Sequence, residues 1–152
     1  MNESILVVDD DVEVRETLSS VLLNDGYLVE TVKNGKEAIR ASETQYFDVA
    51  LIDMELPDMK GIEILRRLKE KQPGMVMIII TGFPSLENAV KAVNEGAHGF
   101  VLKPFNMRDL LKMIRKRLDE KAAEHLHIRM EMEKNALFSE QFKKSKGSIF
   151  TR

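Results

Sequence analysis

The chain has 152 residues, of which 43% are hydrophobic and 32% charged, enough for one compact domain and too few for two of ordinary size. It contains no cysteine, which excludes disulfides and thiolate metal sites. The net charge of −2 is uneven, because residues 121–152 carry seven Lys/Arg and four Glu, whereas residues 1–120 carry sixteen basic and twenty-one acidic residues. The N-terminus lacks a signal-peptide pattern and no apolar run exceeds residues 75–80, so we expect a cytoplasmic protein with no membrane span.

Two hydrophobic periods alternate in the first part of the chain. Residues 4–8 read as a short buried strand, and apolar residues at helical spacing follow until residues 24–26 end the helix. These helical residues are Val14, Leu18, Val21 and Leu22. Residues 27–32 predict a second strand, and Asn34-Gly35 begins a short helix that carries Ala38, Ile39 and Ala41.

The third predicted strand, residues 47–52, is an apolar run that ends in Asp53. A turn at residues 56–58 and Gly61 lead into a helix whose predicted inward positions are Ile62, Leu65 and Leu68. Packing gives no reason for a core strand to end in a carboxylate. Asp53 is therefore either a solvated loop residue or part of a site.

The last part of the chain repeats the alternation twice. Residues 75–80 predict the most apolar strand, and the helix after it begins at the N-cap Ser85 and ends at Gly96. The apolar face predicted for this helix consists of Leu86, Ala89, Val90 and Val93. Residues 98–102 predict a fifth strand, and Asn106 begins a final helix. The inward positions predicted for the final helix are Met107, Leu110, Leu111, Ile114 and Leu118.

Five strands that alternate with five helices through short loops predict a parallel sheet covered on both faces. The predicted fold class is α/β, a doubly wound five-stranded parallel sheet, with the domain at residues 1–120. Residues 119–138 lack Gly and Pro, so we expect the last helix to extend past the domain. Residues 121–152 are then a helical extension and a basic tail, whose last twelve residues are expected to be solvated and disordered.

Polar residues that follow the predicted strands should share the carboxyl edge of the sheet, where such folds bind ligands. They are Asp9 and Asp10 after the first strand, Asp53 after the third, Thr81 after the fourth and Lys103 after the fifth. Clustered carboxylates repel one another unless a cation lies among them, and oxygen ligands suit Mg²⁺. With an ammonium and a hydroxyl opposite, the edge can hold a phosphoryl group that Asp53 attacks as nucleophile. Asp11 is better explained as a helix N-cap.

Four motifs occur in order along this pattern: VVDDD at 7–11, LIDMELPDMKG at 51–61, IIITG at 78–82 and GFVLKPF at 99–105. With them the chain resembles the CheY-like receiver domain of two-component response regulators, which has a flavodoxin-like (βα)5 fold. The resemblance implies that Asp53 is the phosphorylation site. It also implies a Mg²⁺ site with Asp10 as a direct ligand, Asp9 acting through water, and the backbone carbonyl of Glu55 as a further protein ligand.

The same resemblance implies a switch in a phosphorelay. Thr81 and Lys103 take the hydroxyl and lysine roles, Phe100 is the aromatic switch, and the Lys103-Pro104 bond is commonly cis in the family. The implied partners are a sensor histidine kinase and an output protein or domain. The fourth helix, fifth strand and fifth helix form the implied output surface, and either this surface or the C-terminal helix is a candidate homodimer interface. No enzymatic activity is implied beyond self-phosphorylation from phosphodonors and self-dephosphorylation.

Two alternatives stay open at this point. The first is a haloacid-dehalogenase-like phosphatase, because residues 9–12 fit its Asp-x-Asp-x-Val pattern, although the next acids past Lys103 lie on the final helix. The second is a receiver fragment of a DNA-binding transcriptional regulator. Residues 121–152 are too short for a winged helix and glutamates interrupt their basic character, so nucleic-acid binding is not expected of this chain alone.

Overall fold

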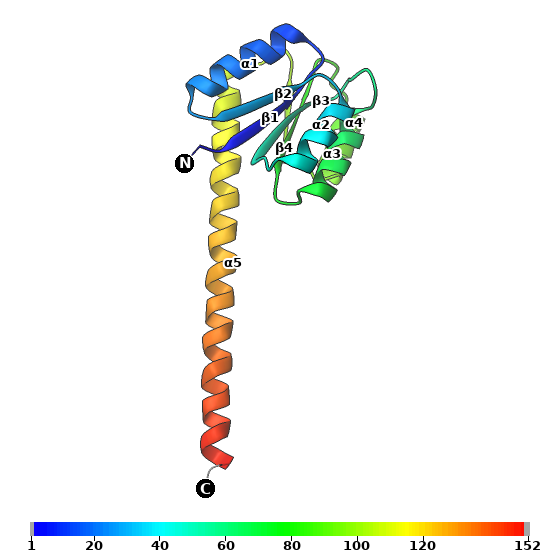
Figure 1. Cartoon of the computed structure of the whole chain (residues 1–152). Helices are drawn as coiled ribbons and strands as arrows, with labels where there is room; N and C mark the ends of the chain where they lie inside the picture. Colours follow the sequence, from blue (N-terminus) through cyan, green and yellow to red (C-terminus); the bar gives the residue numbers. More distant parts are fainter. Residues whose placement is uncertain (1, 151–152) are drawn as a thin grey trace. The chain divides into compact units, whose positions relative to one another are not determined.

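The computed structural model describes residues 2–150, with side chains for residues 2–146. The chain divides into two compact units, Met1–Leu118 and Asp119–Arg152. In the first unit five parallel strands form one sheet in the order β2-β1-β3-β4-β5 (Figure 1). The strands are β1 (Ser4–Val8), β2 (Leu28–Val32), β3 (Val49–Asp53), β4 (Val76–Thr81) and β5 (Gly99–Leu102). The helices are α1 (Val12–Asn24), α2 (Gly35–Thr44), α3 (Gly61–Lys71), α4 (Leu86–Asn94) and α5 (Met107–Phe150).

Helices cover both faces of the sheet and bury two apolar clusters (Figure 1). One cluster lies under α2, α3 and α4 and includes Phe47 and Leu65. The other lies under α1 and the first turns of α5 and includes Leu18 and Ile114. The predicted doubly wound sheet is confirmed. The strand order reverses between β1 and β3, so the ends of these two strands flank the expected ligand position.

The ends of the helices follow the sequence signals closely. Asp11, Asn34 and Ser85 cap α1, α2 and α4 by accepting backbone N–H bonds at 2.9, 2.8 and 3.0 Å. Gly26 and Gly96 follow the ends of α1 and α4 with φ of 95° and 98°, the left-handed region that glycine enters most readily. The predicted N-cap role of Asp11 is thereby confirmed.

The apolar face predicted for α4 is largely exposed. Leu86, Val90 and Val93 have exposed fractions of 82%, 48% and 63%, and Ala92 is the one buried residue of α4. The small Ala92 side chain packs against the sheet, whereas the larger apolar residues point to solvent. Periodicity identifies the apolar side of a helix but not whether the domain covers it.

The helix α5 also departs from the prediction at its end. It continues to Phe150, whereas the sequence suggested disorder from residue 141 onward. Residues 119–146 contain no Gly or Pro, and Lys, Gln and Glu sustain a helix well, which explains the continuation. Residues 151–152, which include the predicted tail residue Arg152, lie outside the described residues. Among the described residues, no helix combines the length and apolar character needed to cross a membrane.

Candidate functional site

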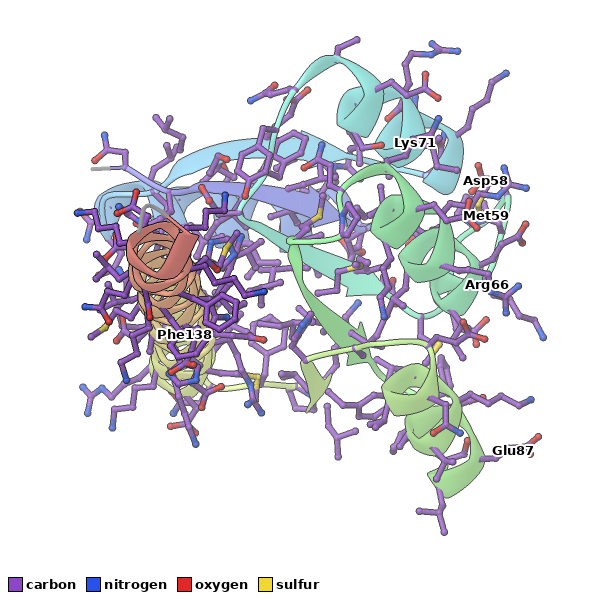
Figure 2. All side chains as sticks on the ribbon, turned by 90° about the horizontal axis from the view of Figure 1, so that it is seen from below. Asp58, Met59, Arg66, Lys71, Glu87 and Phe138 are labelled. Atoms are coloured by element: carbon purple, nitrogen blue, oxygen red, sulfur yellow. The ribbon has the colours of Figure 1, made fainter. Side chains whose placement is uncertain are left out.

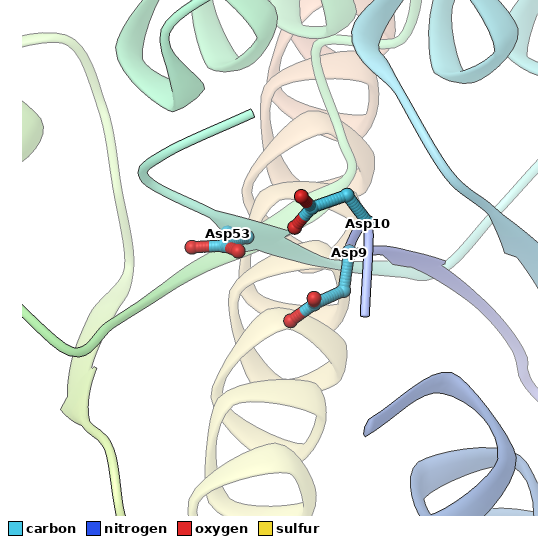
Figure 3. A group of neighbouring side chains, drawn as sticks. All are labelled: Asp9, Asp10 and Asp53. Carbon is cyan, nitrogen blue, oxygen red and sulfur yellow. The ribbon is translucent and has the colours of Figure 1, made fainter. Parts of the chain in front are cut away.

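Three carboxylates meet at the carboxyl edge of the sheet, beside the point where the strand order reverses (Figure 3). Parallel pairing sets Val8 beside Ile52, which brings the next residues, Asp9 and Asp53, to the same edge. One oxygen each from Asp9, Asp10 and Asp53 lies within 4.8 Å of the other two. The sequence prediction that these acids share an edge is confirmed.

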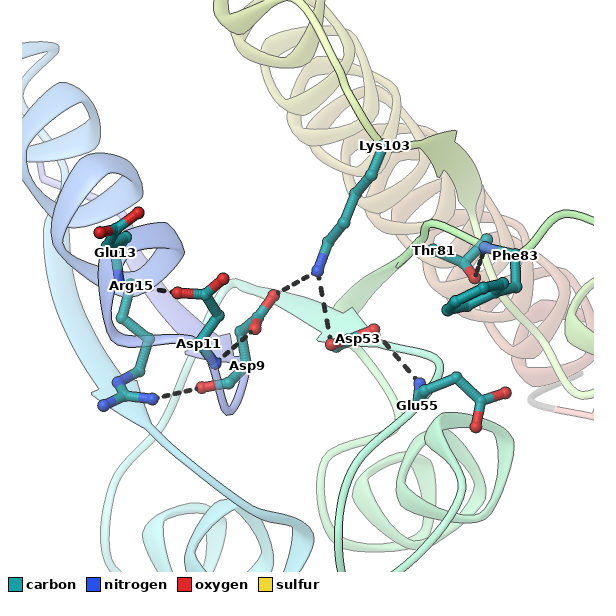
Figure 4. A network of polar contacts seen from close by, with 9 residues as sticks. All are labelled: Asp9, Asp11, Glu13, Arg15, Asp53, Glu55, Thr81, Phe83 and Lys103. Carbon is teal, nitrogen blue, oxygen red and sulfur yellow. Dashed lines mark hydrogen bonds and ion pairs between the residues drawn. The ribbon is translucent and has the colours of Figure 1, made fainter.

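Asp9 is the most firmly held of the three acids. It is 3% exposed, and its carboxylate accepts a hydrogen bond from the backbone N–H of Asp11 at 2.9 Å. The guanidinium of Arg15 donates to the backbone carbonyl of Asp9 at 2.7 Å (Figure 4). Asp10, by contrast, is exposed. The loop after β1 therefore fixes one carboxylate and presents the other to solvent.

Lys103 supplies the positive charge of the cluster. Its Nζ lies 2.9 Å from Oδ2 of Asp9 and 3.4 Å from Oδ2 of Asp53 (Figure 4). Burial lowers the pKa of Lys103, but the hydrogen bond to Asp9 and the charges of both carboxylates outweigh burial and hold its pKa above the ordinary value. The peptide bond between Lys103 and Pro104 is cis, as the resemblance implied.

Asp53 lies at the last position of β3 and is only 7% exposed. Burial and the charge of Asp9 raise its pKa above the ordinary value, although the backbone N–H of Glu55 and the ammonium of Lys103 act in the opposite direction. The N–H of Glu55 donates to Oδ1 of Asp53 at 3.2 Å, and Lys103 contacts Oδ2. A carboxylate with this environment favours an added cation.

The predicted switch residues lie on the neighbouring strands. Thr81 ends β4, is fully buried, and its hydroxyl accepts a hydrogen bond from the backbone N–H of Phe83 at 3.1 Å (Figure 4). Phe100, on β5, is partly buried and packs against the cluster under α2, α3 and α4. The side chain of Phe83 is 75% exposed.

A short, closed loop follows Asp53 and carries Glu55. The backbone N–H of Gly61 donates to the carbonyl of Met54 at 2.9 Å, and Glu55 pairs with Lys60 in an antiparallel bridge. The side chain of Glu55 is exposed, and the backbone N–H of this residue is the group that contacts the Asp53 carboxylate. The loop thus returns to the strand within a few residues.

The donor set of this edge fits Mg²⁺. All three neighbouring side-chain ligands are carboxylates, and one of them, Asp10, is open to the water that Mg²⁺ retains. One ammonium, from Lys103, contacts Asp9 and Asp53, which leaves the cluster with excess negative charge. A divalent cation would offset this charge.

Comparison with known proteins assigns the family. Residues 5–115 match the model of the response regulator receiver domain. The chain belongs to this family. A CheY-like response regulator receiver domain protein from Methanospirillum hungatei JF-1 is 40% identical, with a TM-score of 0.80 over 82% of this chain and 99% of that chain.

Longer proteins share the receiver domain. The transcriptional regulatory protein ZraR of Escherichia coli O157:H7 is 33% identical over 141 residues, which cover 93% of this chain and 31% of that protein. The probable transcriptional regulatory protein TcrX of Mycobacterium tuberculosis is 31% identical over 112 residues, or 74% of this chain and 48% of that protein. The chain therefore spans less than half the length of these curated relatives. The family match decides against the phosphatase alternative.

Two residues beside the site were not singled out from the sequence. Arg15 bonds the backbone of Asp9, and its position on α1 resembles any exposed helical arginine. Asp58 lies in the Leu-Pro-Asp turn after Asp53, where it reads as an ordinary turn residue. Its carboxylate instead binds the N-terminus of α2. The bonds of Asp58 have no local sequence signal, because their partners lie 22 and 23 residues away and are set by the tertiary fold.

Proposed function

We propose that this receiver domain is a phosphorylation switch in which Asp53 accepts a phosphoryl group from a sensor histidine kinase or a small phosphodonor. The observation that carries the proposal is the position of the Asp53 carboxylate, with Lys103 Nζ at 3.4 Å and carboxylate oxygens of Asp9 and Asp10 within 4.8 Å. This constellation supplies a nucleophile, a counter-charge and a candidate metal site in one place.

The proposed metal is Mg²⁺, held by Asp9, Asp10, Asp53 and the backbone carbonyl of Glu55. When bound, Mg²⁺ would neutralise charge on the transferring phosphoryl group. Asp10 is the exposed ligand and Asp9 the buried one, which agrees with a direct role for Asp10 and a water-mediated role for Asp9. Two or three protein oxygens leave positions for water, as Mg²⁺ prefers.

In the proposed transfer an oxygen of Asp53 forms a bond to phosphorus, and the bond from phosphorus to the donor breaks. When the donor is a phosphohistidine, the imidazole nitrogen keeps the electron pair of the broken bond. Lys103 then turns from the Asp53 carboxylate to an oxygen of the new phosphoryl group, since its Nζ already lies between Asp9 and Asp53. Any catalysis by this chain is limited to self-phosphorylation and self-dephosphorylation.

The proposed conformational response begins at Thr81. Its hydroxyl oxygen accepts the N–H of Phe83 in this structure, and its O–H would donate to a phosphoryl oxygen on Asp53 and draw Thr81 inward. Movement of Thr81 frees space for the partly buried Phe100 to turn inward. The surface of α4, β5 and α5 then changes, which shifts binding to a partner.

The proposed partners are a histidine kinase and an output protein or domain. The exposed apolar side chains of Leu86, Val90 and Val93 on α4 support the α4, β5 and α5 surface as the output interface. A homodimer through this surface or through the α5 extension is a second proposal. Since ZraR and TcrX are longer than this chain, we propose that DNA contact, where such an output exists, lies outside these residues.

Intact-mass measurement after incubation with acetyl phosphate tests the proposal. The parent chain should gain one phosphoryl group with Mg²⁺ and little without it. Asp53→Asn should gain none at the same site. A parent chain that stays unmodified with Mg²⁺ under both a small phosphodonor and a phosphorylated kinase domain would refute the proposed function.

A further inference from the structure

The N-terminus of α2 is bound by a residue from the loop after β3. Oδ1 of Asp58 accepts the backbone N–H of Gly35, and Oδ2 accepts that of Lys36, both at 2.9 Å. Burial acts to raise the pKa of Asp58, but these backbone N–H groups outweigh it and hold the pKa below the ordinary value. The carboxylate therefore stays ionised at the positive end of the helix dipole.

A second contact joins the same two segments. A methyl group at Gly35 would overlap the side chain of Met59, which packs directly over this position. Figure 2 shows Asp58 and Met59 beside each other at the outer edge of the domain. The tip of the loop is thus attached to α2 by one bidentate carboxylate and one close packing contact.

The base of this loop is held equally closely to β3. Glu55 and Lys60 pair across the loop, and the N–H of Gly61 bonds the carbonyl of Met54 at 2.9 Å. Only Leu56 and Pro57 separate Glu55 from Asp58 along this loop.

We propose that Asp58 is a positioning residue, whose bond to the α2 N-terminus holds the loop so that the backbone carbonyl of Glu55 stays at the metal site beside Asp53. The inference rests on the proposed Mg²⁺ site. It adds Asp58, a residue outside the acid cluster, to those that set the affinity of this site for Mg²⁺. When Asp58 is removed, the tip of the loop loses its bond to α2, and more of the ordering of the loop is left to the metal, which weakens binding.

Asn34 provides a matched control on the same helix. Its side chain accepts the N–H of Glu37 at 2.8 Å and caps α2, yet it has no part in the bidentate bond to the loop. Asn34→Ala and Asp58→Ala both remove a cap from α2, but only Asp58→Ala removes the bond between α2 and the β3–α3 loop. Asp58→Asn keeps one acceptor oxygen and should be intermediate.

Calorimetric titration of the full chain with MgCl₂ is the test, with circular dichroism to verify folding of each variant. Removal of a group that hydrogen-bonds a metal ligand typically weakens metal binding about 10–100-fold. Asp58 acts one step further from the metal, so we expect about a 3–10-fold weaker Mg²⁺ affinity for Asp58→Ala. Asn34→Ala should bind Mg²⁺ within about twofold of the parent, because its effect is confined to helix stability.

Each possible result is decisive. Weaker Mg²⁺ binding in Asp58→Ala but not in Asn34→Ala supports the inference. Equal Mg²⁺ affinity in the parent and both variants, or equal weakening in both variants, overturns it while the proposed metal site stands. A parent chain that binds no Mg²⁺ overturns the metal site itself and this inference with it. If Asp58→Ala fails to fold, Asp58→Asn decides between the first two results.

Discussion

Gly61 lies where the loop after β3 returns to the strand, and no larger residue fits there. A Cβ added to Gly61 would lie 2.5 Å from the backbone oxygen of Asp53 and 2.8 Å from Cα of Met54. Both atoms belong to the backbone, so no side-chain rotation relieves the overlap and the strand end itself must shift. Overpacking of this kind destabilises a protein by about 1–3 kcal/mol, and two backbone contacts place Gly61→Ala near the upper end, about 3 kcal/mol.

The corresponding change in melting temperature follows from domain size. For the 118-residue unit, an unfolding entropy of about 2.1 cal/mol/K per residue gives about 0.25 kcal/mol/K, so Gly61→Ala should melt about 12 °C lower. Urea denaturation and thermal melts measure both quantities. Gly82→Ala is the control, because the nearest atom to its added Cβ is Cβ of Lys103 at 3.9 Å, which is ordinary contact. Equal stability of the two variants would refute the proposed close approach at Gly61.

Three further predictions concern charge and exposed apolar surface. Lys103→Met leaves Asp9 and Asp53 without their shared ammonium, so chelator-treated protein should lose about 1–3 kcal/mol of unfolding free energy in urea. Added Mg²⁺ should reduce this loss. A loss insensitive to Mg²⁺ would count against a metal site at these carboxylates. The pKa of Asp53 is raised in the folded state, so between its unfolded and folded pKa values the folded state binds more protons than the unfolded state. The stability of metal-free protein should therefore fall as the pH rises from the unfolded pKa of about 3.9 through the folded pKa. Asp53→Asn should remove this part of the pH profile, and an unchanged profile would contradict the assignment. Val90→Ser should alter the unfolding free energy by no more than about 0.5 kcal/mol, because Val90 is 48% exposed. A loss above about 1.5 kcal/mol in urea would contradict the exposed position of Val90.

Most of the fold could be predicted because its signals are local. Each apolar run with a polar end became a parallel strand, and the caps at Asp11, Asn34 and Ser85 depend on residues only two or three positions apart. The acid cluster was equally accessible, since parallel strands end at one edge and Asp9 and Asp53 each follow or end such a strand. The proximity of Asp9 and Asp53 therefore follows from the topology of the sheet alone.

The remainder depends on contacts that sequence spacing does not encode. Leu86, Val90 and Val93 have the period of a buried face, but only the tertiary arrangement decides that Ala92 packs inward instead. Asp58 bonds residues 22 and 23 positions away, and turn propensity accounts for its presence without that bond. The end of α5 was predicted as disordered from its charge, whereas the helix continues to Phe150, and residues 119–146 of it lack Gly and Pro.

The most direct test of the central claim is to map the phosphoryl group after labelling with acetyl phosphate and Mg²⁺. Reductive trapping of the acyl phosphate followed by peptide sequencing in a mass spectrometer identifies the modified aspartate. We predict modification at Asp53, whose carboxylate contacts Lys103 and lies beside those of Asp9 and Asp10. Modification at Asp9 would contradict this account, because it would make the buried acid of the first loop the nucleophile and leave Asp53 without its proposed role.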